Sequence, residues 1–145
     1  MRIKRVDHVG IVVNDLTAVK DFFLELGLEL KGEWEMEGDL MGYAIGLHDV
    51  KVRCVGLGTS DSQTWIELIQ FLSPSNEQEV QKHAANTLGI RHIAITVEDI
   101  ETVVAKLKSR GTELFSEIRQ YKDVYKLCYV RGPEGIILEL AEEMK

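Results

Sequence analysis

The sequence predicts an α+β fold built from two similar βαβββ modules, and three observations lead to that prediction. An internal repeat aligns the segment 7–16 with the segment 91–100 and places His8 on His92 and Asp15 on Asp99. Each copy starts with alternating apolar residues, typical of a strand, and continues with apolar residues at helical spacing. The chain has 145 residues, of which 45% are hydrophobic and 28% charged, which suits one folded domain over residues 1–145.

Each half begins with a strand that leads into a helix. In the first half the strand is expected around 8–13, and Asp15 is expected to cap the following helix. A carboxylate at that position can accept one of the free backbone N–H groups of the first turn. Gly27 is expected to end the helix, because glycine readily adopts the left-handed conformation found there. Asp99 and Gly111 repeat this arrangement in the second half.

Three further strands are expected after each helix. They are expected at 28–36, 52–57 and 64–71 in the first half, and at 114–120, 125–131 and 136–141 in the second. The first half is longer than the second, and its extra residues are assigned to the segment 39–50. This segment is expected to form a loop or a short helix. Gly132-Pro133-Glu134-Gly135 predicts a turn between the last two strands. The segment 73–89 is expected to link module 1–72 to module 90–145 through a short helix.

Charge and composition exclude several classes of partner. The net charge is −7, so the chain has no excess of positive charge to neutralise nucleic acid or an anionic membrane. No apolar run approaches the roughly 20 residues of a membrane span. The charged N-terminal segment lacks the apolar core of a secretory signal. We therefore expect a cytoplasmic protein, with Cys54 and Cys128 reduced and buried.

Four residues that can bind a metal occupy matching positions in the repeat. His8 and His92 lie on the strand face opposite the bulky apolar residues, and each is followed two residues later by a small residue. Glu67 and Glu139 lie within the apolar final strands of the two halves. A carboxylate in such a strand is costly unless a cation, hydrogen bonds or water satisfy it.

Similar folding of the two halves would bring these four side chains together. Two imidazoles and two carboxylates suit a borderline or hard divalent ion, and they would leave positions open for the oxygens of a substrate. A lone histidine at a strand start is more often structural, and a lone glutamate in a terminal strand is usually solvated. The matched occurrence of both types favours a metal site.

Several motifs together resemble the vicinal-oxygen-chelate superfamily, which includes glyoxalase I, methylmalonyl-CoA epimerase, fosfomycin-resistance proteins, bleomycin-binding proteins and extradiol dioxygenases. These motifs are the segments 8–16, 22–23, 26–28, 66–68, 91–94 and 132–140. The resemblance implies two βαβββ modules that curl into a cupped mixed sheet, the glyoxalase-like fold. It also implies one divalent ion (Ni, Zn, Co, Mn or Fe) with His8, Glu67, His92 and Glu139 as its ligands.

Within the superfamily the chain most resembles glyoxalase I, which is lactoylglutathione lyase. Glyoxalase I has a glutamate where this chain has Glu67, whereas methylmalonyl-CoA epimerase has a glutamine there. The residues after it, 68–71, differ from the Thr-Tyr-Asn run of bacterial glyoxalase I, so glutathione does not follow as the thiol. Extradiol dioxygenases bind their metal through two histidines and one glutamate. The second glutamate expected in this chain therefore argues against a dioxygenase reaction.

The resemblance implies a metal-dependent lyase or isomerase that transfers a proton next to a carbonyl group. Its small-molecule substrate could be conjugated to a thiol or to coenzyme A. Glu139 and Glu67 are the expected catalytic bases, and the ion would stabilise the negative charge left when the proton departs. Two alternatives stay open: an enzyme like methylmalonyl-CoA epimerase, and a drug- or metabolite-binding protein without catalysis. Members are commonly dimers, so a homodimer is expected, with the metal site either within one chain or across the interface.

Overall fold

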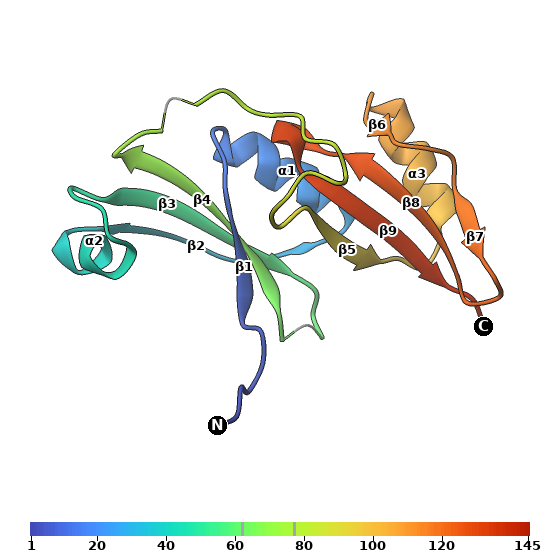
Figure 1. The fold of residues 1–145 in the computed structure, drawn as a ribbon, viewed down its shortest axis with the longest axis horizontal. Coiled ribbons are helices and arrows are strands. Elements are labelled where there is room, and N and C mark those ends of the chain that lie inside the picture. Colours follow the sequence, from blue (N-terminus) through green and yellow to red (C-terminus); the bar gives the residue numbers. More distant parts are fainter. Residues whose placement is uncertain (62, 77) are drawn as a thin grey trace. The chain divides into compact units, whose positions relative to one another are not determined.

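The computed structural model describes residues 1–61, 63–76 and 78–145, and the chain divides into two compact units (Figure 1). We call Met1–Glu79 the N-terminal module and Val80–Lys145 the C-terminal module. Each contains a mixed β-sheet, and each carries a helix between its first and second strands. The predicted α+β class with two βαβββ modules is therefore confirmed. No helix in the described ranges is long and apolar enough to cross a membrane.

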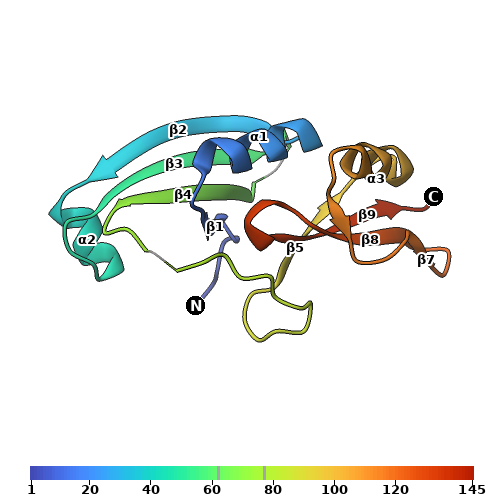
Figure 2. The ribbon, with the colours of Figure 1, turned by 90° about the horizontal axis from the view of Figure 1, so that it is seen from above.

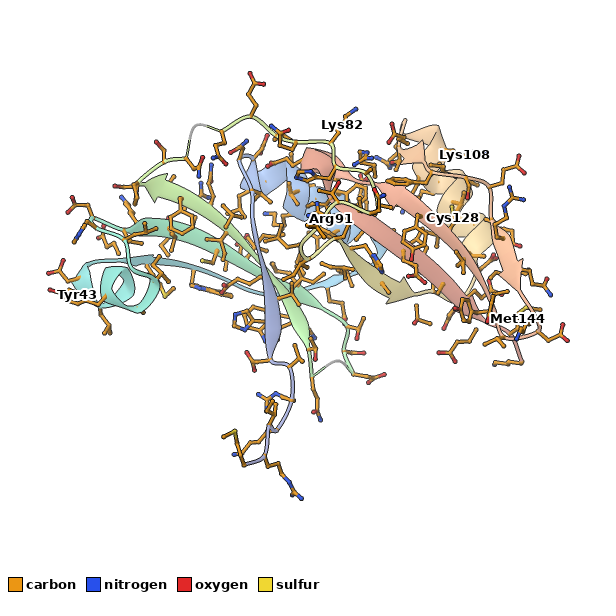
Figure 3. The ribbon with its side chains drawn as sticks, viewed as in Figure 1. Tyr43, Lys82, Arg91, Lys108, Cys128 and Met144 are labelled. Atoms are coloured by element: carbon orange, nitrogen blue, oxygen red, sulfur yellow. The ribbon has the colours of Figure 1, made fainter. Side chains whose placement is uncertain are left out.

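The N-terminal module follows the predicted order of elements, with a helix inserted where the extra residues lie. Its elements are β1 (His8–Val12), α1 (Leu16–Leu26), β2 (Glu29–Glu37), α2 (Asp39–Ile45), β3 (Lys51–Gly58) and β4 (Trp65–Ser73). The strand order is β1-β4-β3-β2, in which β1 is parallel to β4 and the other pairs are antiparallel. On α2, Tyr43 is 82% exposed and its side chain points into solvent (Figure 3).

The C-terminal module repeats this topology with a shorter second strand. Its elements are β5 (His92–Thr96), α3 (Ile100–Ser109), β6 (Glu113–Leu114), β7 (Arg119–Tyr121), β8 (Tyr125–Arg131), a 3₁₀ turn (Pro133–Gly135) and β9 (Ile137–Glu143). The order is β5-β9-β8-β6, and β7 also pairs with β8. The 3₁₀ turn lies where the hairpin turn was predicted. The predicted continuous strand over 114–120 is wrong, because residues 115–118 between β6 and β7 are not in strand conformation.

The predicted helix starts are confirmed in both modules, and Gly27 ends α1 as predicted, whereas α3 ends at Ser109 with Arg110 as its C-cap, one residue before Gly111. The Asp15 carboxylate accepts a hydrogen bond from Ala18 N at 3.1 Å, and that of Asp99 accepts one from Thr102 N at 3.2 Å. These bonds satisfy first-turn donors that have no partner within the helix. Gly27 follows α1 with a φ of 123°, a left-handed conformation that a side chain would disfavour.

A separate apolar core lies between helix and sheet in each module. In the N-terminal module α1 contacts β3 and β4, and its Phe23 is fully buried. In the C-terminal module α3 lies over one face of the β8–β9 sheet (Figure 2) and buries Ile100. Cys54 and Cys128 are both buried free cysteines, as expected. Apolar burial on one sheet face leaves the opposite face of each sheet available for polar chemistry.

The predicted linker helix over 73–89 is wrong. Among the described residues of that segment, 73–76 and 78–89, none is helical. Val80 is 45% exposed and Leu88 is 94% exposed, so the segment buries no apolar face. A short helix gains most of its stability from such burial, and this segment has none to support it. The organisation of both modules into a single domain stays a prediction.

Candidate functional site

The N-terminal module brings His8 and Glu67 together on one face of its sheet. The parallel register pairs His8 with Trp65 and Gly10 with Glu67, so the histidine and the glutamate are diagonal neighbours. The distance from His8 Nε2 to Glu67 Oε1 is 3.8 Å. The Glu67 side chain is only 15% exposed, and the His8 ring stacks on Trp65 with the ring centroids 4.5 Å apart. Sheet register therefore places an imidazole nitrogen beside a largely shielded carboxylate.

Asp7 holds the other nitrogen of the His8 ring. His8 Nδ1 lies 2.7 Å from Asp7 Oδ2, and Arg5 donates to the second carboxylate oxygen at 2.9 Å. These hydrogen bonds, with that from His8 the larger cause, lower the pKa of Asp7. The Asp7 carboxylate can accept a hydrogen bond from Nδ1, and Nε2 is the ring nitrogen that lies toward Glu67. Histidines that bind metals have this arrangement, in which a carboxylate often fixes the ring.

The C-terminal module holds the matching pair at the matching register. His92 pairs with Ile137 and Ala94 pairs with Glu139, and His92 Nε2 lies 3.3 Å from Glu139 Oε1. Here a third side chain joins the pair: Tyr129 donates its hydroxyl to Glu139 Oε1 at 2.7 Å. Its ring meets the His92 ring edge to face, with centroids 5.1 Å apart. The hydrogen bond to the Glu139 carboxylate, with burial adding to it, raises the pKa of Tyr129 to about 12.

Glycine occupies the corresponding position of the N-terminal module. Gly56 faces Glu67 in the β3–β4 register as Tyr129 faces Glu139 in the β8–β9 register. A Cβ atom at Gly56 would lie 3.2 Å from Trp65 and 3.3 Å from Trp34, so two indole rings fill the space beside it. The two candidate ligand pairs therefore have the same register but different surroundings.

The separation within the C-terminal pair fits two ligands of one divalent ion, and that within the N-terminal pair is slightly longer. Ligand atoms about 2.1 Å from an ion, at angles of about 90–110°, lie about 3.0–3.4 Å from each other. The His–Glu separations are 3.8 Å in the N-terminal module and 3.3 Å in the C-terminal module. The C-terminal pair thus offers its nitrogen and oxygen without rearrangement, and the N-terminal pair would have to close by about 0.4 Å or more to reach the range given above. That all four donors bind the same ion stays a prediction.

A second acidic group lies in the C-terminal module, at the start of α3. Carboxylate oxygens of Asp99, Glu101 and Glu142 lie within 4.8 Å of one another. Glu101 pairs with Lys126 at 2.9 Å, and Glu142 accepts a hydrogen bond from Ile100 N at 2.8 Å. Since Asp99 also caps the helix, all three oxygens already have structural partners. We interpret this group as the polar cap of α3.

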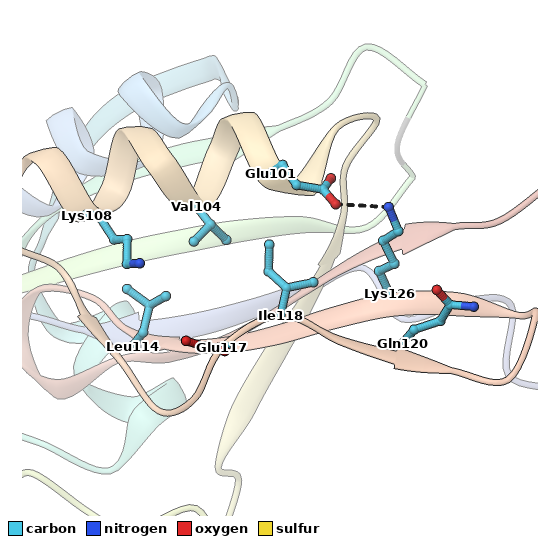
Figure 4. Close-up of a pocket in the computed structure, with 8 residues that line it drawn as sticks. All are labelled: Glu101, Val104, Lys108, Leu114, Glu117, Ile118, Gln120 and Lys126. Carbon is cyan, nitrogen blue, oxygen red and sulfur yellow. Dashed lines mark hydrogen bonds and ion pairs between the residues drawn. The ribbon is translucent and has the colours of Figure 1, made fainter.

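A pocket of about 450 Å³ lies between α3 and the segment from β6 to β8 (Figure 4). Val104, Leu114 and Ile118 form its apolar lining, and Glu101 and Lys126 are paired at its edge. Along β8, Lys126 points to the opposite sheet face from Tyr129, because side chains alternate. The pocket therefore lies on the helix-covered face and not beside His92 and Glu139.

Sequence reasoning missed two residues of the candidate site. Asp7 directly precedes the repeated histidine, and its carboxylate beside an imidazole was a usable signal. Tyr129 carries no such signal, because its contact with Glu139 depends on the exact register between β8 and β9. A change of one residue in that register would turn the Tyr129 ring away from Glu139.

Comparison with known proteins agrees with this architecture. Residues 7–129 match the sequence profile of the Glyoxalase/Bleomycin resistance protein/Dioxygenase superfamily, so the chain belongs to that superfamily. It is 31% identical to the uncharacterised Bacillus subtilis protein YwbC over 139 residues, which are 94% of this chain and 95% of YwbC. The resemblance found in the sequence is therefore confirmed at the level of the superfamily.

Solved structures share the fold over nearly the whole chain. The crystal structure of a glyoxalase family protein from Bacillus cereus matches with a TM-score of 0.94 at 39% identity, covering 100% of this chain and 97% of that one. Glyoxalase I from Leishmania major matches with a TM-score of 0.68 at 24% identity, covering 97% and 88% of the two chains. The second match shows a shared fold and nothing finer.

Proposed function

We propose that this protein is a metal-dependent lyase or isomerase that transfers a proton next to the carbonyl group of a small molecule. The observation that carries the proposal is the repetition of one His–Glu pair in each module, at the same sheet register and with separations of 3.8 and 3.3 Å. A single His–Glu pair in a sheet could be explained by a purely structural role. Two matched pairs in a superfamily that contains glyoxalases favour a shared chemical task.

The chain's own residues supply the donors for the ion. His8 and His92 would bind through Nε2, and Glu67 and Glu139 through carboxylate oxygens. Through its contact with Nδ1, Asp7 would favour the tautomer in which Nε2 is free to bind the ion. When bound, a divalent ion supplies Lewis-acid stabilisation of negative charge that develops on a substrate oxygen.

The two carboxylates are the bases that this chain offers for the proton. Because metal binding lowers the basicity of a carboxylate, the glutamate that acts as the base would first detach from the ion. It would then take the proton from the carbon next to the carbonyl and return it to an adjacent carbon, so the overall reaction adds and removes no atoms. A positioned base typically contributes about 10²–10⁴-fold to such a step. The Glu67 and Glu139 side chains are 15% and 18% exposed, so few water molecules compete with a substrate for them.

Metal analysis followed by hydrogen exchange tests the proposal. Protein purified without chelator should contain stoichiometric divalent metal. The metal-loaded protein should exchange the α-hydrogen of its substrate with deuterated water. Suitable substrates are the methylglyoxal hemithioacetals of glutathione and bacillithiol, and methylmalonyl-CoA. Removal of the metal by a chelator should abolish the exchange, and adding the metal back should restore it.

The same experiment separates the enzyme from a binding protein of the same fold. A protein that holds no divalent metal, and that stays inert after addition of Ni²⁺, Co²⁺, Mn²⁺ or Zn²⁺, would contradict the proposal. Exchange confined to methylmalonyl-CoA would favour the epimerase-like alternative. Exchange with a hemithioacetal would identify the thiol used.

A further inference from the structure

We propose that Tyr129 is a positioning residue that fixes the carboxylate of Glu139 for metal binding; this inference rests on the proposed function. Tyr129 and Glu139 are direct partners in the antiparallel register between β8 and β9. The Tyr129 hydroxyl donates to Glu139 Oε1 at 2.7 Å, a short hydrogen bond of the charge-assisted kind. The same oxygen lies 3.3 Å from His92 Nε2. The bond therefore holds the very oxygen that faces the imidazole.

Tyr129 contacts both members of its ligand pair. Its hydroxyl binds Glu139, and its ring packs edge to face against His92 at 5.1 Å and 84°. A glutamate side chain has several rotatable bonds, and restricting them before the ion arrives removes an entropic cost of binding. One aromatic side chain thus holds the oxygen donor by a hydrogen bond and packs against the ring that carries the nitrogen donor.

In the N-terminal module a different contact orients the His–Glu pair. Gly56, the counterpart of Tyr129, has no side chain to offer Glu67, and Trp34 and Trp65 fill the space beside it. There Asp7 fixes the histidine instead, through Nδ1 of His8. In the C-terminal module the residue before the histidine is Arg91.

Arg91 cannot take the role of Asp7. Its guanidinium group is a donor, and it binds the backbone carbonyl oxygens of Thr87 and Leu88 at 3.0 Å each. Each module therefore anchors one ligand from outside the pair: the N-terminal module anchors its imidazole, and the C-terminal module its carboxylate. Asp7 supports the N-terminal pair and Tyr129 the C-terminal pair. Removal of the Tyr129 hydroxyl would therefore take away the hydrogen bond that holds Glu139.

Substitution Tyr129→Phe tests the inference because it removes the hydroxyl and keeps the ring. Isothermal titration with Co²⁺ should show an affinity about 10–100-fold weaker than that of the wild type, the usual effect of losing a residue that orients a metal ligand. Tyr125→Phe is the matched control, since Tyr125 lies on the same strand and stacks on Tyr121 at 5.5 Å. That control should stay within about twofold of the wild type.

A second pair of variants separates positioning from a general effect on folding. In a Glu139→Ala background, Tyr129→Phe should change the Co²⁺ affinity by less than about twofold, because the residue through which Tyr129 acts is gone. An equal loss in both backgrounds would overturn the inference. So would a Tyr129→Phe protein that binds Co²⁺ as tightly as the Tyr125→Phe control. If the wild type itself binds no Co²⁺, the proposed function fails and this inference fails with it.

Discussion

The two modules have the same strand order and the same His–Glu register, and they differ in which member of the pair they hold in place. In the N-terminal module Asp7 binds His8 Nδ1 at 2.7 Å, and Trp65 stacks on the imidazole. In the C-terminal module Tyr129 binds Glu139 Oε1, also at 2.7 Å. The repeated topology fixes where the donors lie, whereas the non-repeated neighbours decide how firmly each donor is oriented.

This difference has a structural origin in the strand beside the glutamate. On β8 the position facing the carboxylate carries Tyr129, and on β3 it carries Gly56. The glycine admits the Trp34 and Trp65 rings, which meet edge to face at 5.8 Å. The N-terminal site is therefore bordered by apolar aromatic surface, and the C-terminal site by a hydrogen-bonded phenol. We expect the two glutamates to respond differently to the same changes.

The largest expected effect comes from removing the charge of the two proposed bases. Glu67→Gln and Glu139→Gln keep the shape of the side chain and lose the negative charge. Each should lower the rate of substrate hydrogen exchange by about 10²-fold or more, because a positioned base is lost. Rates are measured by NMR in deuterated water with the metal content of each variant determined.

Glu143→Gln is the control, since Glu143 lies on the same strand as Glu139 and is exposed. It should keep nearly full activity. Near-full activity in both Glu67→Gln and Glu139→Gln, with metal still bound, would contradict the role of these carboxylates as bases.

A core substitution tests whether the modules unfold together. Phe23 is a fully buried residue of α1, so Phe23→Ala should lower the free energy of unfolding by about 3–5 kcal/mol. If the two modules form the single domain that the sequence predicts, fluorescence and circular dichroism should report one shared transition at a lower denaturant concentration. Two separate transitions, with only the first one shifted, would show that the modules are independent.

Filling the space at Gly56 tests the aromatic border of the N-terminal pair. Gly56→Val should destabilise the protein by about 1–3 kcal/mol, because even a Cβ atom there meets two indole rings at 3.2 and 3.3 Å. Gly32→Val is the control, since a Cβ at Gly32 would make an ordinary contact of 3.5 Å with Trp34. Equal stability of both variants in urea denaturation would show that the rings beside Gly56 move freely.

The smallest expected effect concerns the two helix caps. Asp15→Ala should cost about 1 kcal/mol of stability at neutral pH. For Asp99, hydrogen bonds from the Thr102 hydroxyl and backbone lower the pKa of the carboxyl group below its ordinary value of 3.8. A carboxyl group whose pKa is lower in the folded protein stabilises it above the unfolded-state pKa, and loses that contribution as the pH falls through the folded value.

The thermal midpoint of Asp99→Ala should therefore lie below that of the wild type at pH 7. The gap should narrow as the pH falls below about 4, since both proteins then lack the charged cap. A gap that is the same at pH 7 and pH 2 would contradict this explanation of the Asp99 cap.

Features that repeat along the chain were predictable, and features that depend on one contact were not. The copies of His8 and Asp15 at His92 and Asp99 revealed the two modules and the helix caps. The break between β6 and β7 was missed, because the segment 114–120 looked like one strand. Ser116 and Glu117 have low strand propensity, and they leave the sheet there.

The linker and Tyr129 show two other limits of sequence reasoning. The segment 73–89 has polar residues compatible with a helix, but only burial of its apolar residues would have stabilised one. Tyr129 is one aromatic residue in an apolar strand, and its role depends on which residue of β9 it faces. Neither burial nor cross-strand partners can be read from one strand alone.

The central claim is that His8, Glu67, His92 and Glu139 bind one shared ion. Anomalous diffraction from crystals grown with Co²⁺ tests it most directly. The account predicts one strong peak bonded to Nε2 of both histidines and to both carboxylates, whether the two pairs come from one chain or from two. Separate ions on the two pairs, or a peak found only at the Asp99, Glu101 and Glu142 carboxylates, would contradict it.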